Sequence, residues 1–217
     1  MKKILFAIPA VVAAAVFYGG CTASPDYTQY ISETRSNVFL YEGDDVKLSI
    51  YCGEKESPFV ADGIRGKLSD IVEIYVRPNG EYENVTISSS SFEGGEMSYL
   101  SARGMWYMSF SAAALSGDTV NVTLDCDGTK TDYTLLSVLS DGVMNCEKAL
   151  DCVREHDGEL FDSLTENGTF RGEIFIRLLY DEKCYYYVGV CDREGNIHAY
   201  LTDAQTGRIV AERTHSM

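Results

Sequence analysis

Hydrophobic and polar residues alternate over much of the chain, in short runs that are separated by turn residues. Between 36 and 140 these runs are Asn37–Glu42, Val46–Cys52, Ile71–Arg77, Asn84–Ser88, Met97–Ser101, Trp106–Ser111, Val120–Cys126 and Tyr133–Leu139. Successive side chains of a strand point to opposite faces, so this alternation predicts strands that bury one face. About eight short strands at this spacing predict an antiparallel β-sandwich over residues 36–140.

Glycine-containing turns separate several of the runs, and Asp127-Gly128 is the clearest of them. An Asp-Gly pair between two alternating runs favours a tight hairpin turn. The segment resembles immunoglobulin-like sandwiches in architecture, and a bridge between Cys52 and Cys126 would suit that resemblance. The tryptophan expected soon after the first cysteine is missing, because Trp106 stands much further along the chain. The pairing of these two cysteines therefore stays open.

The hydrophobic period changes after Ser140. Cys146, Ala149, Leu150 and Val153 recur at helical spacing, behind Asn145 as a capping residue. A helix is therefore expected from Asn145 to Glu155, with a second short helical stretch at Glu159–Leu164. The strand-like runs that follow are Phe170–Tyr180, Cys184–Cys191, Ile197–Leu201 and Arg208–Arg213. The whole pattern predicts an α+β fold in which residues 141–217 form a second unit, a helix followed by a small antiparallel sheet.

The C-terminal runs are similar to the end of PepSY domains. The residues that carry this resemblance are Tyr187-Val188-Gly189-Val190, then Gly195-Asn196-Ile197-His198-Ala199-Tyr200-Leu201, then Asp203-Ala204-Gln205-Thr206-Gly207-Arg208-Ile209-Val210. The family ends in a strand, a glycine-containing turn, an aromatic-bearing strand and an Asp-Ala-x-Thr-Gly hairpin, with a helix ahead of the sheet. The resemblance implies an exported bacterial protein that binds or restrains peptidases or serves as an envelope sensor, without catalytic residues.

The final hairpin also has a physical basis of its own. Asp203 can accept hydrogen bonds from the backbone that follows it, and Thr206 can do so more weakly. Gly207 can take the positive φ that closes a bulged turn. Asp203, Thr206 and Gly207 are therefore predicted to form a structural turn, one that would suit a hairpin in any fold.

The first residues of the chain indicate export. Lys2 and Lys3 precede an apolar run that ends at Phe17, and two glycines then lead to Cys21. The segment resembles a bacterial lipoprotein signal, with residues 1–20 as signal peptide, Cys21 as the lipidated residue and residues 21–35 as a tether. The alternative is a secreted protein cut after Ala23. The apolar run is shorter than the roughly 20 residues that span a bilayer, so the expected location is extracytoplasmic and lipid-anchored to a bacterial membrane.

The chain is strongly acidic, with 33 acidic and 18 basic residues and a formal net charge of −15. Such a surface repels nucleic acid and anionic headgroups, so the membrane is expected as a partner only through lipid on Cys21. Export would permit disulfides among the remaining cysteines, and the sequence leaves their pattern open. These cysteines, none of which form a C-x-x-C motif, are Cys52, Cys126, Cys146, Cys152, Cys184 and Cys191.

Candidate catalytic and metal-binding patterns are weak. The histidines His156, His198 and His215 lie in no metal-ligand motif. Asp125, Asp127 and Asp132 lack the spacing of a calcium loop, because Gly128 comes too early and no glutamate closes the loop. We therefore expect no cofactor, no metal and no catalytic residue.

Three consecutive tyrosines, Tyr185, Tyr186 and Tyr187, are the candidate binding surface. In a strand the middle one faces away from its neighbours, and tyrosine is common at binding surfaces. The predicted function is a non-catalytic binding or regulatory module of the cell envelope, with an envelope protein or peptidase as partner. The alternatives are a hydrolase or metal enzyme whose site assembles from distant residues, and a purely structural envelope component.

Overall fold

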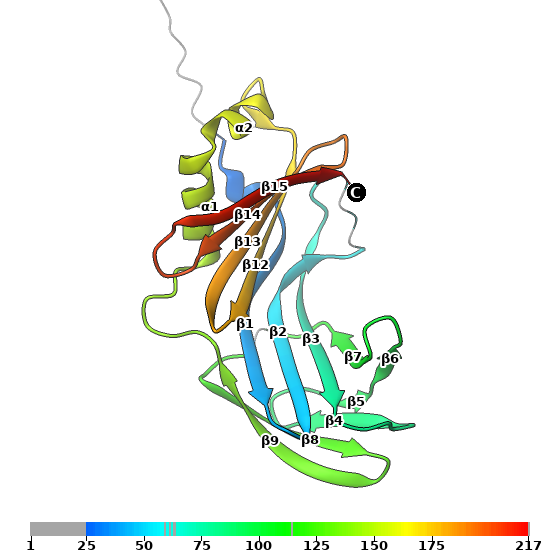
Figure 1. The fold of residues 1–217 in the computed structure, drawn as a ribbon. Helices are drawn as coiled ribbons and strands as arrows, with labels where there is room; N and C mark the ends of the chain where they lie inside the picture. Colours follow the sequence, from blue (N-terminus) through cyan, green and yellow to red (C-terminus); the bar gives the residue numbers. More distant parts are fainter. Residues whose placement is uncertain (1–24, 59, 61, 63, 114, 217) are drawn as a thin grey trace, which may run out of the picture.

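The structure is a computed structural model that describes residues 25–58, 60, 62, 64–113 and 115–216. The first part contains the 3-10 helix η1 (Tyr27–Tyr30) and the strands β1 (Ile31–Glu42), β2 (Val46–Glu56), β3 (Leu68–Pro78), β4 (Val85–Ser89), β5 (Gly95–Glu96), β6 (Ser98–Leu100), β7 (Met105–Phe110), β8 (Thr119–Cys126) and β9 (Thr129–Ser137). The second part contains α1 (Cys146–His156), α2 (Gly158–Ser163), β10 (Thr165–Glu166), β11 (Thr169–Phe170), β12 (Glu173–Asp181), β13 (Lys183–Cys191), β14 (Asn196–Asp203) and β15 (Ile209–Ser216). The backbone is mostly antiparallel sheet with few helices, which confirms the coarse α+β prediction (Figure 1).

Local signals in the sequence explain several of these elements. The side chain of Asn145 accepts a hydrogen bond from the backbone N–H of Lys148 at 2.8 Å, which caps α1 as predicted. Asp127 and Gly128 both have positive φ, +50° and +89°, and connect β8 to β9. Both central residues of a type I′ hairpin turn need positive φ, which is why the Asp-Gly pair occurs there.

The first part of the chain folds as a β-sandwich. Strands β1, β2, β3, β7 and β6 are hydrogen-bonded in that order, and β5, β4, β8 and β9 form the opposing layer. The two layers are joined because Phe39 and Leu40 of β1 also pair with β9. The core between the layers is apolar and includes Phe39, Leu48, Ile50, Ile74, Ile87, Trp106 and Leu135. The apolar phase of the alternating runs thus faces inward, between the two layers.

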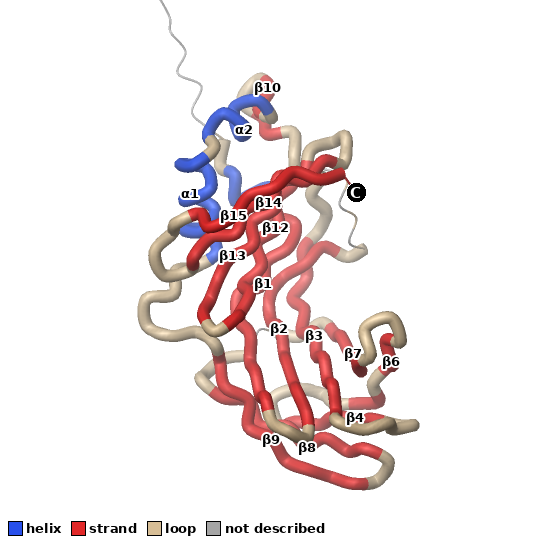
Figure 2. The backbone as a smooth tube through the Cα atoms, in the orientation of Figure 1, coloured by secondary structure: helices blue, strands red, loops and turns tan. Residues whose placement is uncertain are grey.

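The C-terminal part folds as an antiparallel sheet with α1 against one face. Strands β12, β13, β14 and β15 pair in sequence order, and Figure 2 shows both helices gathered at this end of the molecule. The core under α1 includes Ala149, Leu150, Val153, Ile174, Ile176, Leu178, Tyr186 and Val188. The alternate residues of β12 and β13 therefore point to the opposite, open face of this sheet.

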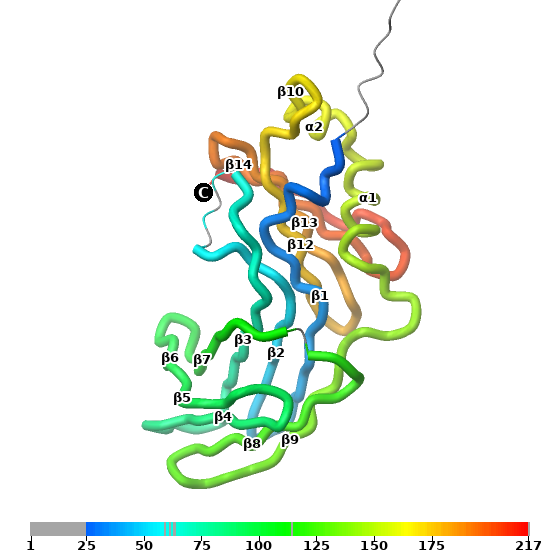
Figure 3. The backbone as a smooth tube through the Cα atoms, turned by 180° about the vertical axis from the view of Figure 1, so that it is seen from behind, coloured from blue at the N-terminus to red at the C-terminus, as the bar shows by residue number. Residues whose placement is uncertain are grey.

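One strand belongs to both parts of the molecule. Strand β1 pairs antiparallel with β2 from Glu33 to Glu42, and its first residues, Ile31 to Arg35, also pair in parallel with β12. The sheet therefore continues without a break from β15 to β6 (Figure 3). The sequence places the start of the sandwich at residue 36 and its first strand at Asn37, whereas β1 begins at Ile31 and its backbone pairing crosses that boundary.

A bulge bends β1 where it leaves β12. The register with β2 shifts between Arg35 and Asn37, so that Ser36 is the extra residue. Gly53 of β2 lies opposite, and a Cβ at this position would come within 1.9 Å of the carbonyl oxygen of Thr34. Only glycine permits this close approach of the two backbones, which explains a glycine in the middle of a long strand.

The last hairpin has the predicted turn chemistry. Asp203 Oδ1 accepts hydrogen bonds from the backbone N–H groups of Gln205 and Thr206 and from the Thr206 hydroxyl. Lys183 donates to the other carboxylate oxygen at 2.8 Å, and these donors hold the pKa of Asp203 well below its usual range. Gly207 adopts φ +76°. The turn therefore fixes the register of β15 on β14.

The six cysteines within the described residues are in the thiol form, without a disulfide between any two of them. Cys184 and Cys191 are buried at opposite ends of β13, and neither is joined to the other. Cys146 belongs to the predicted apolar stripe of the helix, but it is only half-buried at the first position of α1. The lipidation candidate Cys21 and the leader before it lie outside the described residues.

Candidate binding site on the open sheet face

The parallel pairing of β1 with β12 brings charged side chains together on the open face of the sheet. Arg35 lies opposite Arg177, and Glu33 lies opposite Phe175 on β12 and Lys55 on β2. These side chains alternate with residues that pack beneath α1, so they point away from the helix. The open face is therefore polar at the place where the two parts of the molecule join.

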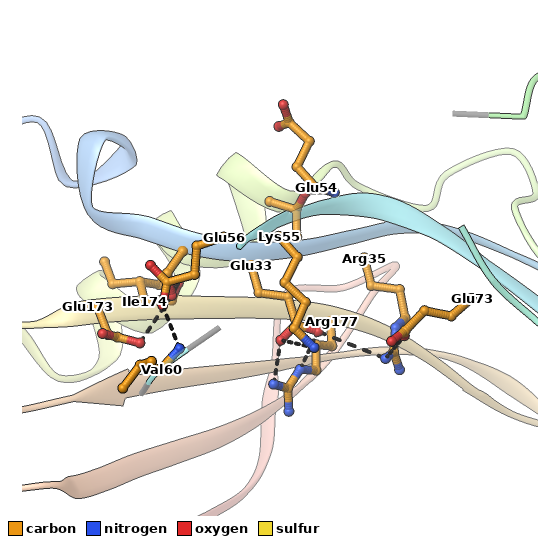
Figure 4. Close-up of polar contacts among 12 residues, drawn as sticks. Glu33, Arg35, Glu54, Lys55, Glu56, Val60, Glu73, Glu173, Ile174 and Arg177 are labelled. Carbon is orange, nitrogen blue, oxygen red and sulfur yellow. Dashed lines mark hydrogen bonds and ion pairs between the residues drawn. The ribbon is translucent and has the colours of Figure 1, made fainter. Parts of the chain in front are cut away.

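Glu33 is the centre of this cluster, which also contains Arg35, Lys55, Glu73 and Arg177 (Figure 4). Arg177 donates to both carboxylate oxygens of Glu33 through Nε, at 2.8 Å, and Nη2. Lys55 Nζ and Arg35 Nη2 each lie 3.9 Å from the same carboxylate. Arg35 also donates to Glu73 at 3.2 Å, so one network links β1, β2, β3 and β12.

Burial and pairing act in opposite directions on these charges. Burial alone would raise the pKa of Glu33, but the Arg177 hydrogen bonds and the charges of Arg177, Lys55 and Arg35 lower it overall. Burial alone would lower the pKa of Arg177, and its contacts with Glu33 raise it instead. Both groups therefore stay ionised, as buried charges do when they are paired and hydrogen-bonded.

Aromatic rings hold the arginines of the cluster in place. The guanidinium carbon of Arg35 lies 4.3 Å from the ring centre of Tyr51. The guanidinium carbon of Arg177 lies 5.6 Å from the ring centre of Phe175 and 5.7 Å from that of Tyr187. Cations over aromatic faces are attracted by the ring electrons, so these contacts restrict where each guanidinium can point.

A pocket of about 540 Å³ opens over the cluster. It is lined by Glu33, Arg35, Ser49, Tyr51, Lys55, Glu73, Tyr75, Arg103, Met105, Arg177, Leu179 and Tyr187. These residues come from both parts of the molecule, and none of them contributes to the two large apolar cores except Tyr51 at the edge of one. Concave sites of this size with convergent polar groups are the usual places where proteins hold ligands.

The three consecutive tyrosines do not form one surface. Tyr186 is only 1% exposed, lies beneath α1 and donates its hydroxyl to the backbone oxygen of Met144 at 2.9 Å. The prediction is therefore wrong for Tyr186, because the strand alternation turns this residue into the core. Tyr185 and Tyr187 are half-buried on the opposite face, and Tyr187 lines the pocket.

A second pair of buried acids, Glu173 and Glu56, lies near the start of the β1–β12 pairing. Glu173 is fully buried. Its carboxylate accepts hydrogen bonds from the Ser32 hydroxyl and from the backbone N–H groups of Asp62 and Ile64. Glu56 lies nearby and accepts from the N–H of Val60. Burial and the negative charge of Glu56 raise the pKa of Glu173 to about 7. Glu173 is thus held by a hydroxyl and by backbone N–H groups, whereas Glu33 is paired with cationic side chains.

The acidic turn between β8 and β9 has a structural role. Asp127 accepts from the backbone of Glu83 and Asn84, and Asp125 accepts from the N–H of Gly128. Asp132 accepts from the Thr123 hydroxyl across the hairpin. Within the part of the chain that the structure describes, no group of three or more His, Cys, Asp or Glu side chains is arranged to hold a metal ion.

The charged cluster could not be predicted from the sequence. Glu33 and Arg177 meet although they lie 144 positions apart, and neither has a distinctive motif around it. One local signal was present, since Arg177 stands in the polar phase of an otherwise apolar run. That signal indicates the face of β12 to which the Arg177 side chain points. It does not indicate that β1 is the neighbouring parallel strand, because strand pairing depends on the whole fold.

Comparison of the chain with protein families, curated proteins and solved structures finds no match. Its function must therefore be argued from the site itself. Over the described residues the helices are all too short or too polar to cross a lipid bilayer.

Proposed function

We propose that this chain is an exported, lipid-anchored protein of a bacterial envelope that acts as a non-catalytic binding or regulatory module. The proposal for its location rests on the leader sequence, with Lys2 and Lys3, the apolar run and Cys21. The partner would be another envelope protein, and the PepSY resemblance suggests a peptidase that the module restrains. The helix α1 followed by the sheet of β12 to β15 has the element order that this resemblance implies.

The observation that carries the binding proposal is the pocket on the open sheet face. It combines arginines with Tyr51, Tyr75 and Tyr187, and tyrosine and arginine are enriched where proteins bind one another. The rest of the open face continues to β15, an edge strand whose outer side has no neighbour among the described strands. A partner can therefore contact both side chains and an unpaired strand edge.

The arrangement of the acids favours binding over the enzyme alternative. General acid–base catalysis needs a carboxyl group that exchanges protons with a substrate near neutral pH. In the pocket, Glu33 is held ionised by Arg177, and Glu73 is engaged by Arg35. Glu173 has the raised pKa that catalysis would use, but it is fully buried and bound by backbone N–H groups.

Site-specific photo-crosslinking in the native cell tests the binding proposal. A photoreactive phenylalanine analogue is placed at Tyr75 or at Tyr187 in the pocket, and at Tyr82 as a control with an exposed ring outside the pocket. We expect the same discrete protein adduct from both pocket positions and none from Tyr82. Adducts from all three positions, or from none, would contradict a binding role for this face.

A separate variant tests the anchor. Cys21→Ala removes the residue that would carry lipid, so we expect the protein to move from the membrane fraction to the soluble fraction. The chain's net charge of −15 offers no electrostatic attraction to anionic lipid in place of the anchor. Retention of the variant on membranes after a salt wash would refute the lipid-anchor proposal.

A further inference from the structure

We propose that the pocket over Glu33 and Arg177 binds a single carboxylate group presented by a peptide segment. The inference names the ligand chemistry of the site on which the proposed binding function rests.

The cations of the pocket lie closer to solvent than its carboxylates. The side chains of Glu33 and Glu73 are 4% and 11% exposed, whereas those of Arg35, Lys55 and Arg177 are 18%, 23% and 30% exposed. Arg103 at the mouth is exposed. An incoming group therefore meets N–H donors first, with the two acids beneath them.

The charged side chains that line the pocket also give it a net positive charge. The lining holds four cationic side chains and two carboxylates, an excess of about two positive charges in a chain whose net charge is −15. Concentrating positive charge in a concave site raises the local attraction for an anion. The pocket therefore has the opposite sign from the molecule as a whole.

Several N–H groups of the arginines are directed away from the internal ion pairs. Arg177 uses Nε and Nη2 on Glu33, which leaves Nη1 outside that fork. Arg35 reaches both Glu33 and Glu73 through Nη2. Arg103 forms no ion pair with any described residue. A guanidinium has five N–H donors in a planar fork that matches a carboxylate, so the cluster can accept one more anion.

The site is ordered before any ligand arrives. Tyr51 holds Arg35, and Phe175 and Tyr187 hold Arg177, at the distances given above. The acids at the floor fix the same guanidinium groups from below. Groups that are held in place lose little conformational freedom on binding, which favours affinity.

The negative net charge of the chain favours an anion with a single charge over a polyanion. A polyanion such as nucleic acid or an anionic membrane surface would bring many charges near a chain of −15 and be repelled. A single carboxylate gains from the pocket without meeting that repulsion to the same extent. The tyrosine walls and Leu179 offer contact to an apolar or aromatic neighbour of the carboxylate, as a peptide segment supplies.

Three matched dipeptides test the proposal on the full chain in detergent micelles. The first is N-acetyl-phenylalanyl-glutamate amide, with a side-chain carboxylate. The second is N-acetyl-phenylalanyl-glutamine as the free acid, with a C-terminal carboxylate. The third is the neutral N-acetyl-phenylalanyl-glutamine amide. Binding is followed through the Nε–Hε NMR signals of Arg35, Arg103 and Arg177.

We expect at least one charged peptide to shift these signals, and the neutral peptide to bind about tenfold or more weakly, because a charge-assisted pair is lost. The stronger of the two charged peptides identifies the source of the carboxylate. Inorganic phosphate should bind more weakly than that peptide. Equal binding of the neutral peptide or of phosphate would overturn the proposal, and so would an absence of shifts with both charged peptides.

Two arginine variants locate the site. Arg103→Gln should weaken binding of the charged peptide several-fold, since it removes a cation at the mouth. Arg208→Gln changes another exposed arginine, in the β14–β15 turn, and should leave binding unaltered. Equal effects of both variants would refute the site. Pocket crosslinks without peptide binding would refute this inference alone, whereas peptide binding without crosslinks would refute the proposed envelope partner.

Discussion

In the sandwich part of the molecule the inner face of β1, β2 and β3 is covered by a second layer of strands, whereas in the C-terminal part the inner face of β12 to β14 is covered by α1. Both covered faces are apolar. The opposite face carries the charged cluster where β1 meets β12, and a small apolar cluster of Phe175, Cys191, Ile197 and Ala199 on the C-terminal strands. The open face is continuous across the two parts, and ion pairs cross it where β1 meets β12.

The apolar cores of the two parts and the contacts between β1 and β12 contribute to stability in different ways. Each part has its own apolar core, as independent domains do. The join between them contains backbone hydrogen bonds and buried charges, and Ile31 and Val38 of β1 also pack in the core beneath α1. Removing one partner of a buried ion pair is destabilising, because the other charge is left unpaired. We therefore expect the two parts to unfold together, and the following variants test that expectation from the largest effect to the smallest.

The largest effect should come from emptying either core. Ile74 of the sandwich and Ile176 beneath α1 are both fully buried. Each change to alanine should lower the free energy of unfolding by about 2–5 kcal/mol, from lost burial and a residual cavity. Trp106, the one tryptophan of the chain, reports on the sandwich by fluorescence, and far-ultraviolet circular dichroism reports on α1.

In a cooperative molecule Ile176→Ala should shift the fluorescence and dichroism transitions by the same amount. A fluorescence transition that stays at the wild-type denaturant concentration while the helix signal moves would show two independent domains. Such a result would also show that the predicted boundary near residue 141 separates two parts that unfold independently.

Removing the charge at the join should come next. Glu33→Gln leaves Arg177 without its ionic partner in a largely buried site, at a cost of about 2–4 kcal/mol. The control is Glu166→Gln, whose carboxylate pairs with Arg171 at 3.3 Å but is 67% exposed, so about 0.5 kcal/mol or less is expected. Urea unfolding of both variants measures the difference, and equal small effects would show that the join contributes little.

The final turn should have a smaller effect that is confined in origin to the C-terminal part. Gly207→Val strains a residue at φ +76° and places a Cβ 2.7 Å from Cys152 Sγ, so a loss of about 1–3 kcal/mol is expected. Gly142→Val is the control, because Gly142 has φ +90° but no atom within 4 Å of the added Cβ.

Adding Cys152→Ala to Gly207→Val separates crowding from backbone strain. The double variant should recover part of the lost stability in thermal unfolding, since the sulfur no longer opposes the new side chain. Gly207→Val without any loss would remove the turn assignment. A loss equal to that of Gly142→Val would leave strain as the whole cause.

The smallest effect should be the pH dependence from Glu173. Its pKa of about 7 lies above the 4.5 of an unperturbed glutamate, so the folded chain binds the proton more tightly than the unfolded chain. The free energy of unfolding should therefore fall by on the order of 1–2 kcal/mol between about pH 5.5 and about pH 7 from this group, and level off by about pH 8.

Glu173→Gln resembles the protonated acid and should remove this contribution. The measurement is the difference in urea midpoint between wild type and variant at several pH values. The difference should grow in favour of the variant toward pH 7. A constant difference across that range would contradict the raised pKa and the contrast with Glu33.

The sequence predicted the local structure well and the assembly poorly. Alternation located most strands, Asn145 located the start of α1, and Gly207 located the last turn, because each depends on neighbours in the chain. The first half of β1 was missed, since Ile31 to Arg35 carry a polar, charged pattern that becomes a strand only beside β12. The need for glycine at position 53 could not be predicted, because it depends on the bulge in the neighbouring strand β1.

The candidate site followed the same rule. Tyr187 could be predicted as a binding residue because tyrosines are recognisable in a strand, and alternation separates it from Tyr186. Glu33 and Arg177 could not be predicted, because an ion pair between strands far apart in sequence depends on their register. Periodicity gives the face of each side chain, and only the folded sheet gives its partner.

The parallel pairing of β1 with β12 also determines the order in which the molecule can form. A chain that emerges amino end first presents β1 and the sandwich strands long before β12, since the contacting residues are 144 positions apart. Until β12 arrives, the first half of β1 has one unsatisfied edge, which is prone to pair with another chain. Closing such a distant contact slows folding relative to hairpin formation, so the strand that joins the two parts is also the last to be completed.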